Sequence, residues 1–170
     1  MSCDVQRSIR LLRPVSKGRG KGLPEGPGRG TDRASAMRGD VVASKVESIE
    51  RCLARIAELC PEGARSLVDR TVEEAVILNL QRACEQAIRL ASHLVAVRRP
   101  GLPQEARHAF ALLCDAGAID AEIADRMKRM IGFRTVAIHE HQRLGRAILG
   151  SIIELRLEDF RAFVAAVVRA

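Results

Sequence analysis

Aromatic residues are nearly absent from this sequence of 170 residues: they make up 2% of it, with four Phe, no Trp and no Tyr. A hydrophobic core must therefore consist mainly of Leu, Ile, Val and Ala, which suits packed helices better than sandwiches of aromatic-rich strands. No stretch approaches the roughly 18 consecutive apolar residues that span a bilayer, and the first residues contain no apolar segment typical of a secretion signal. These absences predict an all-α protein of the cytoplasm that does not bind a membrane.

The cysteines show no pattern of a disulfide framework or a zinc site. There are five of them, an odd number, and none forms a Cys-x-x-Cys pair. Four lie within apolar helical patterns, where a free thiol behaves as a small hydrophobic side chain: Cys52, Cys60, Cys84 and Cys114. We therefore expect free thiols in a reducing compartment.

Other familiar ligand patterns are also missing. No Gly-rich phosphate loop follows a predicted strand, and the acidic residues at 73–74 and 120–125 lack the spacing of a helical metal site. His93 and His108 stand alone in helical patterns, and we interpret both as structural. The sequence thus predicts neither a metal nor a cofactor.

The positive charge is concentrated at the beginning of the chain. The net charge is +7, but residues 1–36 carry eight Lys and Arg against three acids, whereas residues 37–170 carry twenty against eighteen. Residues 1–36 are also rich in Gly and Pro, so we expect a disordered basic leader before a helical domain at 37–170. The leader is either an arm that binds RNA or an extension from a start codon placed upstream; Met37, just before the first good helix, favours the extension.

Apolar residues recur with the period of a helix from Asp40 onward, and no segment alternates as a strand does. Asp40 and Asp120 are expected to cap the starts of the first and fourth helices, and Gly117 to end the third. The last stripe includes Ile148 and Leu155. We expect a bundle of about five helices, at about 40–60, 66–97, 104–116, 120 onward and 146–168.

The fourth helix carries the candidate chemistry, in Arg134, His139 and His141. An Arg guanidinium binds phosphate well, and His transfers protons near neutral pH, so the three residues could cleave RNA without a metal. Arg134 and His139 nevertheless point about 140° apart on a straight helix. A bend at Gly132, a long reach by Arg134 or a second copy of the chain would bring them together. The alternative is an ordinary solvated helix face, or a His that caps the end of a helix.

The segment from Gly132 to His141 resembles the Gly-Phe-Arg-Asn-x-x-x-His-x-Tyr signature of the HepT-like branch of the HEPN superfamily. Residues 45–53 resemble the opening helix of that family, residues 79–88 resemble its second helix, and 101–117 resemble its third. The resemblance covers about 40–168. It implies a symmetric dimer or dimer of dimers and metal-independent RNA cleavage, as the toxin of a type VII toxin–antitoxin pair.

The same resemblance implies roles for individual residues. Arg134 becomes the phosphate clamp, and His139 the general acid or base for attack by the ribose 2′-OH. The family's partner, an MntA-like nucleotidyltransferase, transfers AMP to the motif tyrosine, but that position is His141 here and the chain has no Tyr to modify. Thr135 also replaces the family's Asn. We hypothesise that His141 supplies a second proton-transfer group; the alternative to an enzyme is a non-catalytic dimeric module that binds the nucleotidyltransferase.

Overall fold

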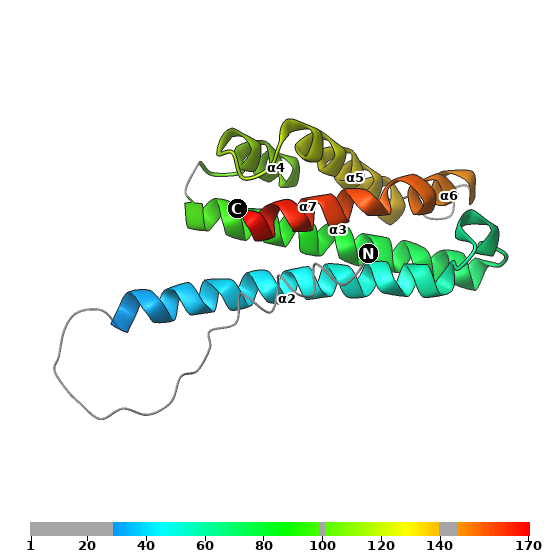
Figure 1. The fold of residues 1–170 in the computed structure, drawn as a ribbon. Helices are drawn as coiled ribbons and strands as arrows, with labels where there is room; N and C mark the ends of the chain where they lie inside the picture. The colour runs from blue at the N-terminus through cyan, green and yellow to red at the C-terminus, as the bar shows by residue number, and fades with distance from the viewer. Residues whose placement is uncertain (1–28, 99–100, 140–145) are drawn as a thin grey trace, which may run out of the picture. The chain divides into compact units, whose positions relative to one another are not determined.

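The computed structural model describes residues 29–98, 101–139 and 146–170, with side chains at 39–98, 101–134 and 146–170. All regular structure in these ranges is helical, which confirms the all-α prediction (Figure 1). The elements are α2 (Arg29–Leu59), the short 3-10 helix η1 (Gly63–Ser66), α3 (Arg70–Arg98), α4 (Ala106–Asp115), α5 (Ala121–His139), α6 (Arg146–Leu155) and α7 (Leu157–Arg169).

The chain divides into two compact units, residues 1–44 and 45–170. Within the described part of the first unit, residues 29–44 form the beginning of α2. Residues 1–28 of the expected leader lie outside the described residues, so the leader stays a prediction. The second unit contains the helical core.

Helix α3 is the central element of the second unit. Helices α4, α5 and α6 all pack against it, and α5 also packs against α4 and α7 (Figure 1). Ten residues of α3 are buried along its length, most of them Leu, Val and Ala. Two of the fully buried aromatic residues, Phe110 of α4 and Phe163 of α7, meet edge to face with their ring centroids 5.3 Å apart. An aliphatic core with few aromatic side chains is what the composition predicts.

Two of the expected caps position α5. The Oδ1 atom of Asp120 accepts a hydrogen bond of 2.7 Å from the backbone N–H of Ile123, which satisfies a free donor at the start of the helix. Gly117 has a φ of +69°, and its N–H donates to the carbonyl of Cys114 just after α4 ends. A glycine adopts this left-handed conformation without strain. The sharp turn between α4 and α5 therefore follows from the sequence.

Two expected helix boundaries are wrong. Helix α2 begins at Arg29, so Asp40 is an exposed interior residue of a helix and not its cap. The single helix expected at 146–168 is two helices, α6 and α7, separated at Arg156. Leu157, just after the break, is buried, whereas Leu155 and Ile148 of the expected stripe, both in α6, are exposed. The apolar residues of α7 are buried against the core, at the expense of one continuous helix over 146–168.

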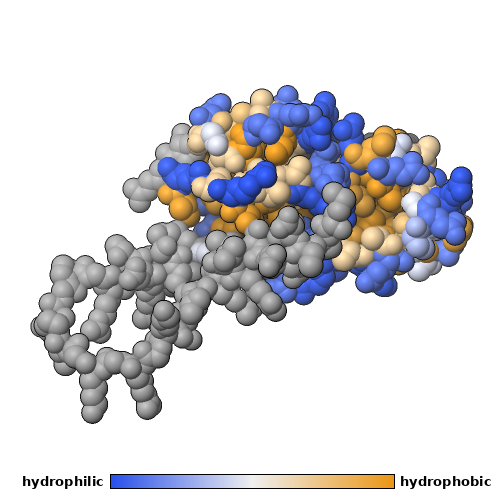
Figure 2. Space-filling view, in the orientation of Figure 1, coloured by the Kyte–Doolittle hydropathy of each residue, from blue (hydrophilic) through white to orange (hydrophobic). Residues whose placement is uncertain are grey.

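No helix in the described ranges combines the length and hydropathy needed to cross a bilayer. On the face shown in Figure 2, hydrophilic side chains interrupt the apolar surface of the described residues.

Candidate functional site

Helix α5 carries the backbone of both Arg134 and His139. It runs without a break from Ala121 to His139, so Gly132 neither ends nor interrupts it. On a regular helix the two residues are separated by about 140° around the axis and about 7.5 Å along it. One copy of α5 therefore directs them to different sides. The side chain of His139 and all of His141 lie outside the described residues.

Arg134 extends from α5 toward α3. It is half-buried, and its Nε atom is buried without a hydrogen-bond partner. Its positive charge acts on Cys84 of α3, whose Sγ lies 3.8 Å from the carbonyl oxygen of Met130. Burial raises the pKa of the Cys84 thiol to about 12, and the nearby Arg134 only partly opposes this shift. Cys84 is therefore a neutral thiol, and it does not neutralise the guanidinium.

No carboxylate among the described side chains forms an ion pair with Arg134. Many of the other arginines on this part of the chain do have such partners, as Arg89 has in Glu85 and Arg126 in Glu122. A guanidinium that is half-buried, charged and unpaired can give its donors to an anionic ligand, and phosphate oxygens match its geometry.

Gly132 allows a second arginine to approach α5 closely. A Cβ atom placed on Gly132 would lie 2.6 Å from Nη2 and 3.6 Å from Cζ of Arg107, the second residue of α4. The guanidinium of Arg107 therefore lies directly over the glycine. The sequence suggested a bend at Gly132; in the structure α5 continues through this residue, and Arg107 approaches it closely. Sequence reasoning did not identify Arg107, because this contact joins two helices.

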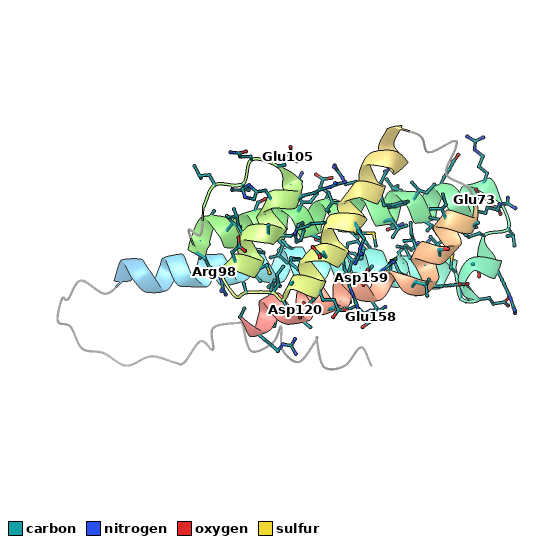
Figure 3. The ribbon with its side chains drawn as sticks, turned by 90° about the horizontal axis from the view of Figure 1, so that it is seen from above. Glu73, Arg98, Glu105, Asp120, Glu158 and Asp159 are labelled. Carbon is teal, nitrogen blue, oxygen red and sulfur yellow. The ribbon has the colours of Figure 1, made fainter. Side chains whose placement is uncertain are left out.

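A small pocket follows another face of α5. It has a volume of about 110 Å³ and is lined by Arg126, Arg129, Met130, Phe133, Ile152, Arg156 and Asp159. Asp159, at the start of α7, is 3% exposed; its Oδ1 lies 3.4 Å from Nη1 of Arg126 and its Oδ2 3.8 Å from Nη1 of Arg156. Figure 3 places Asp159 close to the point where α5 passes α7. The pair with Arg126 joins α5, the helix that carries the motif, to α7, whereas the pair with Arg156 lies within the start of α7.

His93 and His108, which the sequence led us to interpret as structural, lie on α3 and α4. His108 accepts a hydrogen bond of 3.3 Å from the backbone N–H of Gln104, and the Nε2 atom of His93 is buried without a partner. Across the ranges with described side chains, no group of three His, Cys, Asp or Glu residues has the arrangement of a metal site. The four cysteines expected to be free thiols are free there: Cys52, Cys60, Cys84 and Cys114.

One further carboxyl has a perturbed environment. Burial raises the pKa of Glu50 on α2 above its ordinary value of 4.5; Arg161 on α7 opposes this shift and Glu158 on α7 adds to it. The Oε1 atom of Glu50 is buried without a hydrogen-bond partner. Glu50 of α2 faces α7 and lies outside the helix that carries the motif.

Comparison with known proteins relates the chain to ribonucleases. A family model described as "Ribonuclease HepT-like" matches residues 49–167. The mRNA nuclease HepT of Shewanella oneidensis is 36% identical over 125 residues, which cover 74% of this chain and 94% of that protein.

Solved structures of similar sequence have the same fold. A tri-AMPylated HEPN toxin of Shewanella oneidensis, in complex with an MNT antitoxin, aligns with a TM-score of 0.72 and 34% identity, covering 77% of this chain and 98% of the other. A toxin–antitoxin structure with AMP-PNP aligns with a TM-score of 0.73 and 34% identity, covering 77% of this chain and 99% of the other. The expected helical architecture is thus confirmed by relatives as well as by the fold itself.

Proposed function

Because the chain belongs to the Ribonuclease HepT-like family, we propose that it is the ribonuclease toxin of a toxin–antitoxin pair and cleaves RNA through Arg134 and His139. The observation that carries this proposal is the half-buried guanidinium of Arg134, which has no acidic partner among the described side chains and lies on the same helix as His139. Family membership supports the ribonuclease class, and the position of the two residues supports their assignment to the chemistry.

In the proposed reaction the ribose 2′-OH attacks the adjacent phosphorus atom, and the bond from phosphorus to the 5′ oxygen breaks. His139 accepts the proton of the 2′-OH or donates one to the leaving oxygen. Arg134 stabilises the negative charge that develops on the phosphoryl oxygens. The products are a 2′,3′-cyclic phosphate and a 5′-OH. Because the nucleophile belongs to the substrate, the reaction selects RNA over DNA and requires no metal-activated water.

The direction of the two residues on α5 favours a site shared by two chains. Since Arg134 and His139 point about 140° apart on one helix, a symmetric dimer can combine Arg134 of one chain with His139 of the other. Mixing Arg134→Ala with His139→Ala protein then restores cleavage, up to about a quarter of the unaltered rate, because half of the dimers are mixed and each contains one intact site. Complete absence of restored activity after subunit exchange indicates a site built within one chain.

The proposed partner is a nucleotidyltransferase antitoxin, as in the Shewanella oneidensis complex. This chain has no Tyr, so transfer of AMP to a phenol cannot inactivate it. We therefore propose that the antitoxin inhibits this chain either by binding to it or by modifying a group other than a tyrosine. The missing tyrosine also favours a second candidate function, a non-catalytic dimeric module that binds the nucleotidyltransferase.

The test is cleavage of a mixed RNA substrate in EDTA by the unaltered protein and by Arg134→Ala and His139→Ala. We expect both substitutions to reduce the rate by about 100-fold or more. A matched control is Arg89→Ala, which removes a surface arginine already paired with Glu85 and should retain activity. No cleavage by the unaltered protein, or equal cleavage by all variants, supports the binding module.

The role of His141 requires its own comparison. If His141 transfers the second proton, His141→Phe lowers cleavage sharply and removes one limb of the pH–rate profile. An unchanged rate excludes His141 from the chemistry and leaves Arg134 and His139 as the proposed pair.

A further inference from the structure

Arg107 is an exposed cation held against the motif helix. It is the second residue of α4, which begins beside Glu105, labelled in Figure 3. Its Nη2 atom lies 2.6 Å from an ideal Cβ built on Gly132, so a side chain at this position would collide with it. Among the described side chains, no acidic group forms an ion pair with Arg107. Its guanidinium therefore retains donors for an external anion.

The position of Gly132 places this cation on a particular side of α5. Gly132 and His139 are seven residues apart, so their backbone positions share a face to within about 20°. Arg134 lies about 160° around the helix from Gly132 by the same geometry. Arg107 therefore approaches the face of α5 that carries His139 and not the face that carries Arg134.

Further cations lie on the same side of α5. Lys128 and Arg129 are each within about 60° of Gly132 around the axis, one turn nearer the start of the helix. Lys128 forms an ion pair of 3.2 Å with Asp125, whereas Arg129 borders the pocket described above. Among the described side chains of α5 within about 60° of Gly132, Lys128, Arg129 and Asp125 are the charged ones, and Arg107 of α4 adds a third cation. A polyanion that reaches His139 along it meets Arg107 on the way.

We propose that Arg107, lying across Gly132, is a second RNA-phosphate-binding residue, which holds the strand on the His139 face of α5 while Arg134 acts from another face. This inference rests on the proposed function, because it names how the same substrate is held. About 10.5 Å along the helix separates Gly132 from His139, so Arg107 contacts a phosphate neighbouring the one that is cleaved. It binds substrate and takes no part in proton transfer.

The proposal gives Gly132 a definite purpose. Glycine in a helix interior is about 1 kcal/mol less favourable than alanine. An alanine at this position would displace the guanidinium of Arg107, which is the mobile end of a long side chain. Gly132→Ala and Arg107→Ala therefore remove the same contact by different routes, and their effects on RNA binding must not add.

The experiment measures binding of the full-length protein to a 2′-O-methyl RNA oligonucleotide, which lacks the nucleophile and is not cut. We expect Arg107→Ala to weaken binding about tenfold at low salt, as loss of a charged hydrogen bond predicts. The slope of log affinity against log salt should fall by about 0.7, the value for one phosphate contact on a single strand. Arg89→Ala, which removes the same charge elsewhere, should change neither quantity.

Gly132→Ala supplies the second arm of the test. It should weaken binding in the unaltered background and have no further effect in the Arg107→Ala background. Additive effects of the two substitutions, or an unchanged affinity and salt slope in Arg107→Ala, overturn the proposal. So does absence of binding by the unaltered protein. If binding depends on Arg107 while unmodified RNA is not cleaved, the Arg107 site stands and the proposed ribonuclease function fails.

Discussion

Replacing Asp159 by Asn should measure how firmly α5 is held to α7. Asp159 is the one buried charged residue among the described side chains, and its two oxygens face Arg126 and Arg156 at 3.4 Å and 3.8 Å. The Asn amide has nearly the same volume, so the substitution removes the charge without opening a cavity. The expected loss of stability therefore reports on the ion pairs and not on packing.

The magnitude follows from the exposure of the partners. At about 4 Å and an effective dielectric constant of about 20, one ion pair is worth about 4 kcal/mol before desolvation is subtracted. The side chains of Arg126 and Arg156 are 37% and 47% exposed, so water screens both pairs and hydrates both arginines once the carboxylate is gone. No charge is left buried and unpaired. We therefore expect Asp159→Asn to lower the free energy of unfolding by about 1–2 kcal/mol, below the 3–5 kcal/mol typical of a broken buried pair.

Urea unfolding followed by circular dichroism tests this estimate. The midpoint should fall with an unchanged slope, and Tm should fall by about 2–8 °C. Glu122→Gln is the control: it removes the other partner of Arg126, on the exposed side of α5, and should change stability by less than about 0.5 kcal/mol. A loss below about 0.3 kcal/mol for Asp159→Asn, or equal losses for the two variants, would refute the reasoning.

Three further predictions concern groups away from these ion pairs. Because burial raises the pKa of Glu50 above 4.5, the unaltered protein loses stability as pH rises through that pKa. Glu50→Gln should therefore be more stable than the unaltered protein at pH 7 by less than about 1 kcal/mol and equally stable below pH 4, as measured by chemical unfolding at both pH values. Cys84, with its pKa raised to about 12, should be alkylated by iodoacetamide at pH 8 far more slowly than Cys114, as measured by peptide mass spectrometry; equal rates would contradict its burial. Gly132→Ala should raise Tm, because α5 gains helix propensity while Arg107 can move aside; a fall in Tm would show that Arg107 is rigidly held.

Most of the fold could be predicted from the sequence, because the ends of several helices are determined by residues close to them in the chain. Asp120 and Gly117 act as expected at the two ends of the α4–α5 turn, since each effect involves residues close in the chain. The start of α2 and the break at Arg156 were predicted incorrectly. Period alone does not distinguish one long amphipathic helix from two that bury separate stripes.

The residues of the candidate site likewise fall into two groups, those that the local sequence identifies and those that only contacts between helices identify. Arg134 and His139 follow from a contiguous motif and from its resemblance to a family, and the structure describes α5 as one helix through both. Arg107 and Asp159 act through contacts between α4 and α5 and between α5 and α7. Nothing in their local sequence distinguishes them from other exposed arginines or from acids in the first turn of a helix. Only the packing identifies them.

Gly132 is the residue at which local preference and the structure disagree most clearly. It occupies the interior of an unbroken helix, where glycine is unfavourable, and it forms no turn or cap there. Natural sequences depart from local preference mainly where function requires it. Here the missing side chain leaves room for the guanidinium of Arg107 immediately before the motif. The energetic penalty in α5 therefore has a specific compensation, a cation placed on the side of the helix that Arg134 does not reach.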